Sequence, residues 1–125
     1  MLFRSRAWNT AWKGKISLLR GDLVTLGHLM NENHQLVDEM MAYCGFVDGA
    51  GWANNLFIQT ALDSGALGAK LTGAGSGGSV YALVQPGDET RLEESWREKA
   101  VEVGLQSALI YQPKISSKGL LVEKL

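Results

Sequence analysis

The chain has 125 residues, of which 46% are hydrophobic and 20% charged, values typical of a folded domain. Twelve basic and thirteen acidic residues leave a net charge of −1, so no overall positive field favours nucleic acid as a partner. No apolar stretch reaches the roughly 20 residues of a membrane span, and the first residues lack the apolar core of a signal peptide. We therefore expect a single domain over residues 1–125, with neither nucleic acid nor a membrane as its partner.

Cysteine and histidine exclude two further classes of site. Cys44 is the single cysteine, so the chain forms no internal disulfide, and we expect a reducing, cytoplasmic location. His28 and His34 are six residues apart, and no Cys/His cluster has the spacing of metal ligands. We expect no metal ligands in this chain.

The first half of the sequence predicts helices. Residues 7–20 are compatible with a helix that Gly21 ends, and Asp22 is the predicted N-cap of a second helix that runs to about Tyr43. Side chains at spacings of three and four along the second helix predict a buried stripe on which a cysteine is inert. The stripe comprises Leu26, Met30, Asn33, Val37, Met40 and Cys44.

The second half mixes strands with helices. A three-glycine loop over residues 45–51 leads into a predicted helix, Trp52–Asp63. Residues 67–72 and 79–84 are predicted strands on either side of the glycine-rich residues 73–78.

The remaining elements complete the predicted order. Asp88 begins a helix of about 15 residues that Gly104 ends, and residues 107–112 and 119–122 are predicted strands. Helices and strands do not alternate regularly, so we expect an α+β fold: one antiparallel sheet with helices packed on one face.

Glycine is concentrated in one place. Seven of the 15 glycines fall between Gly65 and Gly87, and four lie within residues 73–78. These residues match G-x-G-x-x-G, but a strand follows where a dinucleotide-binding loop requires a helix, and no Gly-Lys-Ser/Thr follows as in a Walker loop. A plain hairpin turn needs only one or two glycines. Four predict a backbone that approaches something closely, with amides free to face an anion; a merely structural turn is the alternative.

A longer motif surrounds this loop. Residues 65–79 (GALGAKLTGAGSGGS) resemble the third conserved motif of the GHMP kinases, the superfamily of galactokinase, homoserine kinase, mevalonate kinase and phosphomevalonate kinase. Gly21-Asp22 and residues 26–34 (LGHLMNENH) are similar to the helix that precedes that motif, and the resemblance spans about residues 7–122. Ser76 stands where the family usually has glycine, and Ser79 where it often has cysteine.

The resemblance implies a ferredoxin-like C-terminal GHMP kinase domain. In the complete kinase, the γ-phosphoryl group of ATP passes to a sugar or other small alcohol, with Mg²⁺ as cofactor. The family's ATP-binding loop, magnesium ligands and catalytic acid belong to an N-terminal domain absent from this chain. We therefore expect no catalytic residue here, no tightly held cofactor, no activity of the isolated chain, and self-association through the surface that would meet the missing domain.

Seven residues are the predicted phosphate- or substrate-proximal loop: Thr72, Gly73, Ala74, Gly75, Ser76, Gly77 and Gly78. Asn33, His34 and Lys70 are candidates to face the substrate. The alternatives are a core amide bonded to a neighbouring backbone for Asn33, a satisfied helix-edge imidazole for His34 and a solvated side chain for Lys70.

Other polar and aromatic residues have structural interpretations. Asp38 and Glu39 are interpreted as exposed helix acids. The tryptophans are interpreted as core or domain-interface anchors; they are Trp8, Trp12, Trp52 and Trp96. A second function also fits the sequence: a stand-alone ferredoxin-like ligand-binding or regulatory module that uses the glycine loop to hold a small anion without catalysis.

Overall fold

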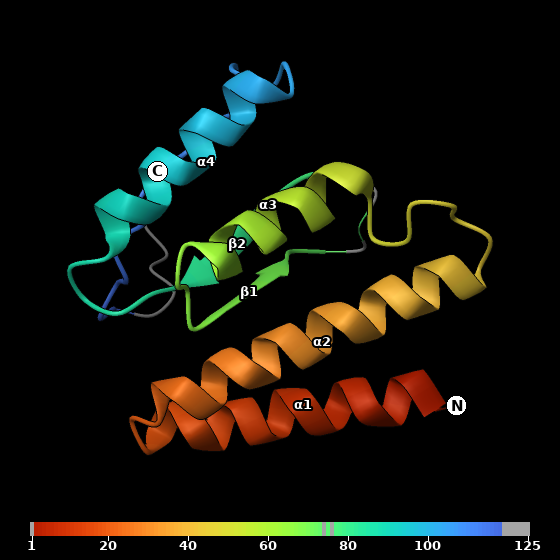
Figure 1. The fold of residues 1–125 in the computed structure, drawn as a ribbon. Coiled ribbons are helices and arrows are strands. Elements are labelled where there is room, and N and C mark those ends of the chain that lie inside the picture. The colour runs from red at the N-terminus through yellow and green to blue at the C-terminus, as the bar shows by residue number, and fades with distance from the viewer. Residues whose placement is uncertain (1, 74, 76, 119–125) are drawn as a thin grey trace, which may run out of the picture.

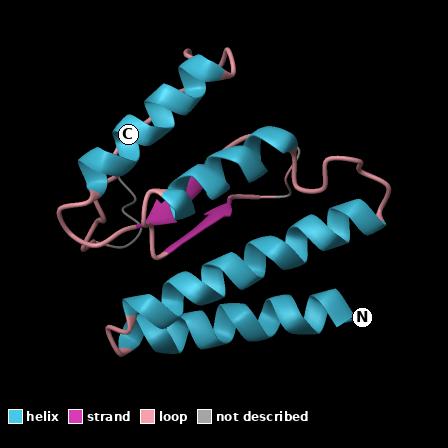
Figure 2. Ribbon diagram, viewed as in Figure 1, coloured by secondary structure: helices cyan, strands magenta, loops and turns pink. Residues whose placement is uncertain are grey.

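The computed structural model describes residues 2–73, 75 and 77–118. Its elements in chain order are α1 (Leu2–Leu19), α2 (Leu23–Tyr43), α3 (Trp52–Asp63), β1 (Gly68–Leu71), β2 (Val80–Leu83) and α4 (Glu89–Glu102). Figure 1 shows α1 and α2 side by side and antiparallel, with β1 between α2 and α3 and with α4 beyond α3. The strands therefore lie inside a mainly helical molecule (Figure 2), and the predicted α+β class is confirmed.

Local sequence sets most helix boundaries. The Asp22 carboxylate accepts the Thr25 N–H at 3.0 Å and so caps α2, as predicted. Gly21, with φ 69°, separates α1 from α2. The prediction placed the start of α1 too late: the helix begins at Leu2, and Arg6 in its added turns reaches Glu39 of α2 at 3.9 Å.

The two strands form an antiparallel pair in which Ala69 lies opposite Ala82, and Leu71 opposite Val80. Because side chains alternate along a strand, these four share one face of the sheet. That face packs with α3 in the main core, whose buried members are Ala50, Ile58, Ala61, Ala69, Leu71 and Leu92.

Two glycines allow α2 to meet β1 at backbone distance. A Cβ at Gly27 would overlap the Leu67 carbonyl, and a Cβ at Gly68 would overlap the Gly27 carbonyl. One turn further along α2, the Asn31 side chain accepts the Ala69 N–H at 2.9 Å. Helix α2 therefore occupies the side of β1 that faces away from β2.

The predicted strand over residues 107–112 is wrong. These residues have no regular structure, and Leu109 and Tyr111 are exposed by 85% and 70%. Their apolar side chains bury little surface, so the alternating pattern has no packing to stabilise it. The predicted strand at 119–122 lies outside the described residues.

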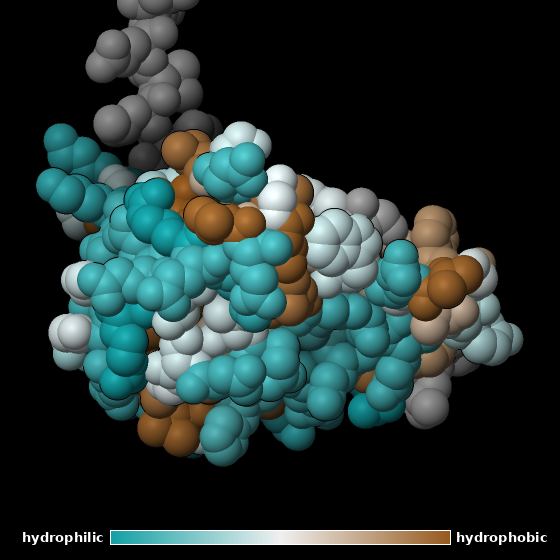
Figure 3. All heavy atoms as spheres, turned by 45° about the horizontal axis from the view of Figure 1, so that its top comes forward, coloured by the Kyte–Doolittle hydropathy of each residue, from teal (hydrophilic) through white to brown (hydrophobic). Residues whose placement is uncertain are grey.

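Three of the four tryptophans are not core residues, so for them the domain-interface alternative stays a prediction. Trp8, Trp12 and Trp52 are more than half exposed, whereas Trp96 is half-buried and donates its indole N–H to the Phe57 carbonyl at 2.8 Å. Hydrophilic side chains dominate the face shown in Figure 3, and the apolar residues there form separate patches. None of the helices in the described part of the chain combines the length and apolarity needed to cross a membrane.

Candidate functional site

The glycine loop, residues 72–79, connects β1 to β2. Its backbone explains why four glycines are concentrated there. Gly73, Gly75, Gly77 and Gly78 have φ values of 76°, 95°, 138° and 100°, a region that residues with a side chain rarely adopt. The Thr72 N–H donates to the Ser79 carbonyl at 2.8 Å and closes the base of the loop. Ala74 and Ser76 lie outside the described residues.

A second loop, residues 44–51, lies against the glycine loop at the same end of the molecule (Figure 1). The contact is between Gly75 and Ala50: a Cβ at Gly75 would lie 3.1 Å from the Ala50 carbonyl oxygen. Ala50 is fully buried in the core. We call residues 48–51 the platform, because the glycine loop rests on them.

Side chains from two helices hold the platform in place. Asp38 of α2 accepts the Ala50 N–H at 2.8 Å, and the buried Asn54 of α3 donates to the Ala50 carbonyl at 2.8 Å. Both polar atoms of Ala50 are therefore bonded to side chains. A Cβ at Gly49 would overlap the Asp38 carboxylate, and Gly49 also has a positive φ of 55°. Only glycine fits there without rearrangement.

Asp38 also joins the two helices to each other. The same carboxylate oxygen that accepts the Ala50 amide accepts the Asn55 side-chain N–H, again at 2.8 Å. Partial burial raises the pKa of Asp38, but these two hydrogen bonds and the nearby His34 outweigh burial and hold that pKa below its usual value. Asp38 is therefore a charged acceptor at neutral pH.

His34 extends this network beneath α3. Its Nε2 lies 2.9 Å from the Asn55 side-chain oxygen, and His34 is only 8% exposed. Since the Asn55 amide nitrogen donates to Asp38, its oxygen can only accept, and Nε2 must carry the proton. The Nδ1 atom has no hydrogen-bond partner among the residues that the structure describes. Burial lowers the pKa of His34, which favours the neutral imidazole.

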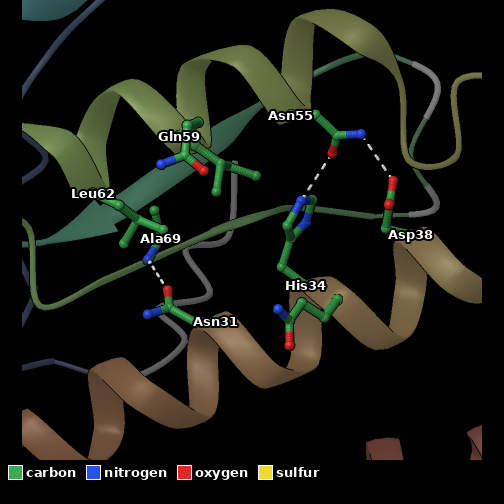
Figure 4. Close-up of a pocket in the computed structure, with 9 residues that line it drawn as sticks. Asn31, His34, Asp38, Asn55, Gln59, Leu62 and Ala69 are labelled. Carbon is green, nitrogen blue, oxygen red and sulfur yellow. Dashed lines mark hydrogen bonds between the residues drawn. The ribbon is translucent and has the colours of Figure 1, made fainter.

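A cavity of about 320 Å³ opens between α2 and α3 beside this network. Figure 4 shows His34 rising from α2 to the side chain of Asn55, whose other end turns to Asp38. Most of the lining side chains are polar: Asn31, His34, Gln35, Asp38, Asn55 and Gln59. These side chains could therefore contact a ligand mainly through hydrogen bonds. Across the described ranges, no group of three or more His, Cys, Asp or Glu is arranged to hold a metal ion.

A second groove, of about 310 Å³, lies between α1, α2 and the other face of the sheet, and Asn33 and Lys70 are among its lining residues. Asn33 donates to the Thr10 hydroxyl at 3.1 Å, so its partner is a side chain and not a backbone group. Lys70 is half-buried, with Nζ 3.0 Å from the Leu71 carbonyl oxygen and 5.5 Å from the centre of the Tyr81 ring. Burial lowers the pKa of Lys70. The solvated lysine that the sequence favoured is therefore wrong.

The structure does not bring the three substrate-facing candidates together. Asn33 and Lys70 line the groove beside α1, whereas His34 lies in the α2–α3 cavity. The alternative of a satisfied helix-edge histidine is wrong, since His34 is buried and its Nδ1 has no partner in the described part of the chain.

Sequence reasoning misplaced Asp38 and Cys44, and it did not single out Asn54 or Asn55. Asp38 is half-buried, Cys44 is exposed, and only Glu39 is the exposed acid expected. One pattern pointed to the amides. Adjacent asparagines in a first helical turn are poor helix formers that favour bonds to nearby backbone, and Asn54 makes such a bond. Nothing in the sequence marks Asp38 as the partner of Asn55.

Comparison with known proteins gives related kinases. Residues 55–102 match the family described as GHMP kinases C terminal. A galactokinase of Thermococcus kodakarensis is 42% identical over 72 residues, 57% of this chain and 19% of the relative. A mevalonate kinase of Pyrococcus horikoshii is 35% identical over 105 residues, 82% of this chain and 26% of the relative. A galactokinase of Streptomyces coelicolor is 31% identical over 93 residues, 74% and 22% of the two chains. The chain thus spans about a fifth to a quarter of the length of these relatives.

Proposed function

Because the chain belongs to the GHMP kinase superfamily, in which it corresponds to the C-terminal domain, we propose that it supplies half of the site of an ATP-dependent small-molecule kinase. In this proposal, residues 1–125 form one domain, and an N-terminal domain completes the site. The acceptor is a sugar or other small alcohol, the chemistry that the names galactokinase and mevalonate kinase share.

The observation that carries the proposal is the backbone of the glycine loop. Four residues with positive φ lie within six positions, and Gly73, Gly77 and Gly78 are exposed. Successive backbone N–H groups in a turn that contains left-handed residues can converge on an anion. Thr72 and Ser79 add hydroxyl groups at the base of the loop. We therefore assign the phosphate-proximal role to residues 72–78, and we assign magnesium binding to the N-terminal domain.

Positioning and charge stabilisation account for most of phosphoryl-transfer catalysis, so half of a site is a poor catalyst. We expect no ATP consumption by the 125-residue chain with galactose, homoserine or mevalonate in the presence of Mg²⁺. Turnover with any of these acceptors would contradict the proposed division of the site.

A titration of the isolated chain with ATP, followed at the backbone amides by NMR, tests the assigned loop. We expect millimolar binding, with shifts concentrated at Gly73, Gly75, Gly77 and Gly78. Gly77→Ala should remove these shifts. Gly87→Ala is the matched control, because Gly87 also has a positive φ, 99°, but lies in the turn before α4. Micromolar binding would instead favour the stand-alone binding module, and shifts spread over other elements would contradict the loop assignment.

A further inference from the structure

We propose that Asp38 is a positioning residue for the glycine loop: by binding the Ala50 amide and Asn55 together, it sets where the platform lies and so where the loop is held. This inference rests on the proposed function only for its consequence, the affinity of the loop for phosphate groups. Its structural part depends on contacts among Asp38, Ala50, Asn55 and Gly75 alone.

A short connection runs from the Asp38 carboxylate to the glycine loop. Asp38 accepts the N–H of Ala50, and Gly75 packs on the carbonyl oxygen of the same residue. The atoms nearest to a Cβ at Gly75 all belong to the Ala50 backbone, so a shift of the platform displaces the backbone on which Gly75 packs. Gly75 should therefore move with the platform.

The negative charge of Asp38 strengthens this connection. One of its oxygens accepts two N–H donors, from Ala50 and Asn55, at 2.8 Å each. A charged acceptor holds two donors more strongly than a neutral one. The Asn55 amide is in turn oriented by His34, which takes up the Asn55 oxygen and leaves the nitrogen facing Asp38. His34 therefore fixes Asn55, and Asn55 helps to fix Asp38.

The network offers a graded test at Asp38. Asp38→Ala removes the oxygen that accepts from both Ala50 and Asn55. Because both donors meet one oxygen, Asp38→Asn can keep an amide oxygen in the same place, and it then removes only the charge.

We expect Asp38→Ala to reduce the hydrogen-exchange protection of the Ala50 amide by about 10-fold or more, the value of a hydrogen bond to a charged group. Asp38→Ala should also shift the Gly75 and Gly77 amide resonances. In both readouts Asp38→Asn should lie between Asp38→Ala and wild type, because a neutral acceptor holds the two donors less strongly. Asp63→Asn is the control, because Asp63 is an exposed acid of α3 whose side chain accepts from Gln59. Unchanged glycine amides in Asp38→Ala, or an Asp38→Asn chain no closer to wild type than Asp38→Ala, would overturn the proposal.

An acid titration of the wild-type chain tests the same coupling without any variant, so it remains available if the variants do not fold. As Asp38 is protonated in acid, the Gly75 amide should shift with the same midpoint as the Asp38 carboxyl carbon, whereas the Gly104 amide, which donates to the Val101 carbonyl at the end of α4, should not. Separate midpoints for Gly75 and Asp38 would refute the coupling. Coupling without any effect of inorganic triphosphate on the loop would leave Asp38 as its positioning residue and refute the phosphate role.

Discussion

The two sides of α2 line hollows of nearly equal volume, about 320 and 310 Å³, but they are built differently. On the α3 side, Asp38, Asn55 and His34 form a continuous chain of hydrogen bonds to the platform. On the α1 side, Asn33 donates to the Thr10 hydroxyl, which donates to the Ala7 carbonyl of its own helix, and the other lining residues include apolar and half-exposed side chains. We therefore expect substitutions to cost more stability on the α3-facing side of α2 than on its α1-facing side.

The largest expected effect comes from adding one methyl group on each side. Gly27→Ala places a Cβ on the Leu67 carbonyl, so we expect a loss of about 3 kcal/mol in the free energy of unfolding, since backbone must move. Gly14→Ala is the matched control on α1, because its Cβ would lie at an ordinary 3.5 Å from Leu26. That control should gain about 0.5–1 kcal/mol from helix propensity. Urea denaturation measures both, and equal effects would contradict the comparison.

Removing one asparagine amide from each side of α2 should give the next largest difference. Asn54→Ala leaves the Ala50 carbonyl without its side-chain donor, and the expected cost is about 1–3 kcal/mol. Asn33→Ala removes a bond to Thr10 at a half-buried position, where water can replace the amide, and should cost less than about 1 kcal/mol. Thermal unfolding compares the two variants. A larger loss in Asn33→Ala would place the specified face on the wrong side of α2.

The two sides should also respond to opposite ends of the pH scale. His34 and Asp38 both have lowered pKa values in the folded chain, so the unfolded chain binds more protons. Their stabilisation is present above their ordinary pKa values of 6.5 and 3.8 and is lost as pH falls below each. Asp38 raises and Lys70 lowers the pKa of His34, but burial dominates. Denaturation between pH 7 and 5 should therefore show falling stability, and His34→Gln should flatten that slope.

Beside α1, the relevant groups are Lys70 and Tyr81. Burial lowers the pKa of Lys70 and raises that of Tyr81, so both favour their neutral forms. Rising pH relieves the cost of burying the charged lysine, but above pH 10.0 it removes the stability associated with neutral Tyr81. Lys70→Met abolishes the gain from deprotonating the lysine, so only the loss of stability from ionising Tyr81 should remain. Stability measured from pH 9 to 11 should then fall more steeply than in wild type. An unchanged slope would show that Lys70 does not contribute to this pH dependence.

The smallest effect should come from the exposed tryptophans. Trp8 and Trp12 stack with their ring centres 6.1 Å apart, yet they are 67% and 51% exposed. The double variant Trp8→Ala/Trp12→Ala should change the free energy of unfolding by less than about 0.5 kcal/mol per site. If this surface drives the expected self-association, sedimentation should show a more monomeric chain. A large loss of stability would instead show that the pair belongs to the core.

The same comparison explains what the sequence could predict. Helix caps such as Asp22, the Trp52–Asp63 helix and the glycine loop depend on neighbouring residues, and the structure confirms them. The stripe on α2 was only partly predicted, because the helix packs on two sides and its second buried side holds Gly27 and His34. Apolar periodicity cannot reveal a side occupied by glycine and polar residues.

The network around Asp38 depends on residues 12 to 17 positions apart that meet only after α2 and α3 pack. An acid at a helical position is usually solvated, and no local pattern shows that a later loop will place an amide beside it. The predicted strand at 107–112 failed for the opposite reason: its alternating pattern is local, but the described residues give it no neighbour to pack against.

The bond from Asn31 to the Ala69 N–H has a consequence for how the sheet can grow. An unpaired strand edge is a template on which another strand can add, including one from a different molecule. Here a helix side chain already takes an outward N–H of β1, and the backbone contact between Gly27 and Gly68 blocks the same border. Any added strand must therefore enter beside β2. The pair of glycines and the asparagine give the small sheet a direction of extension.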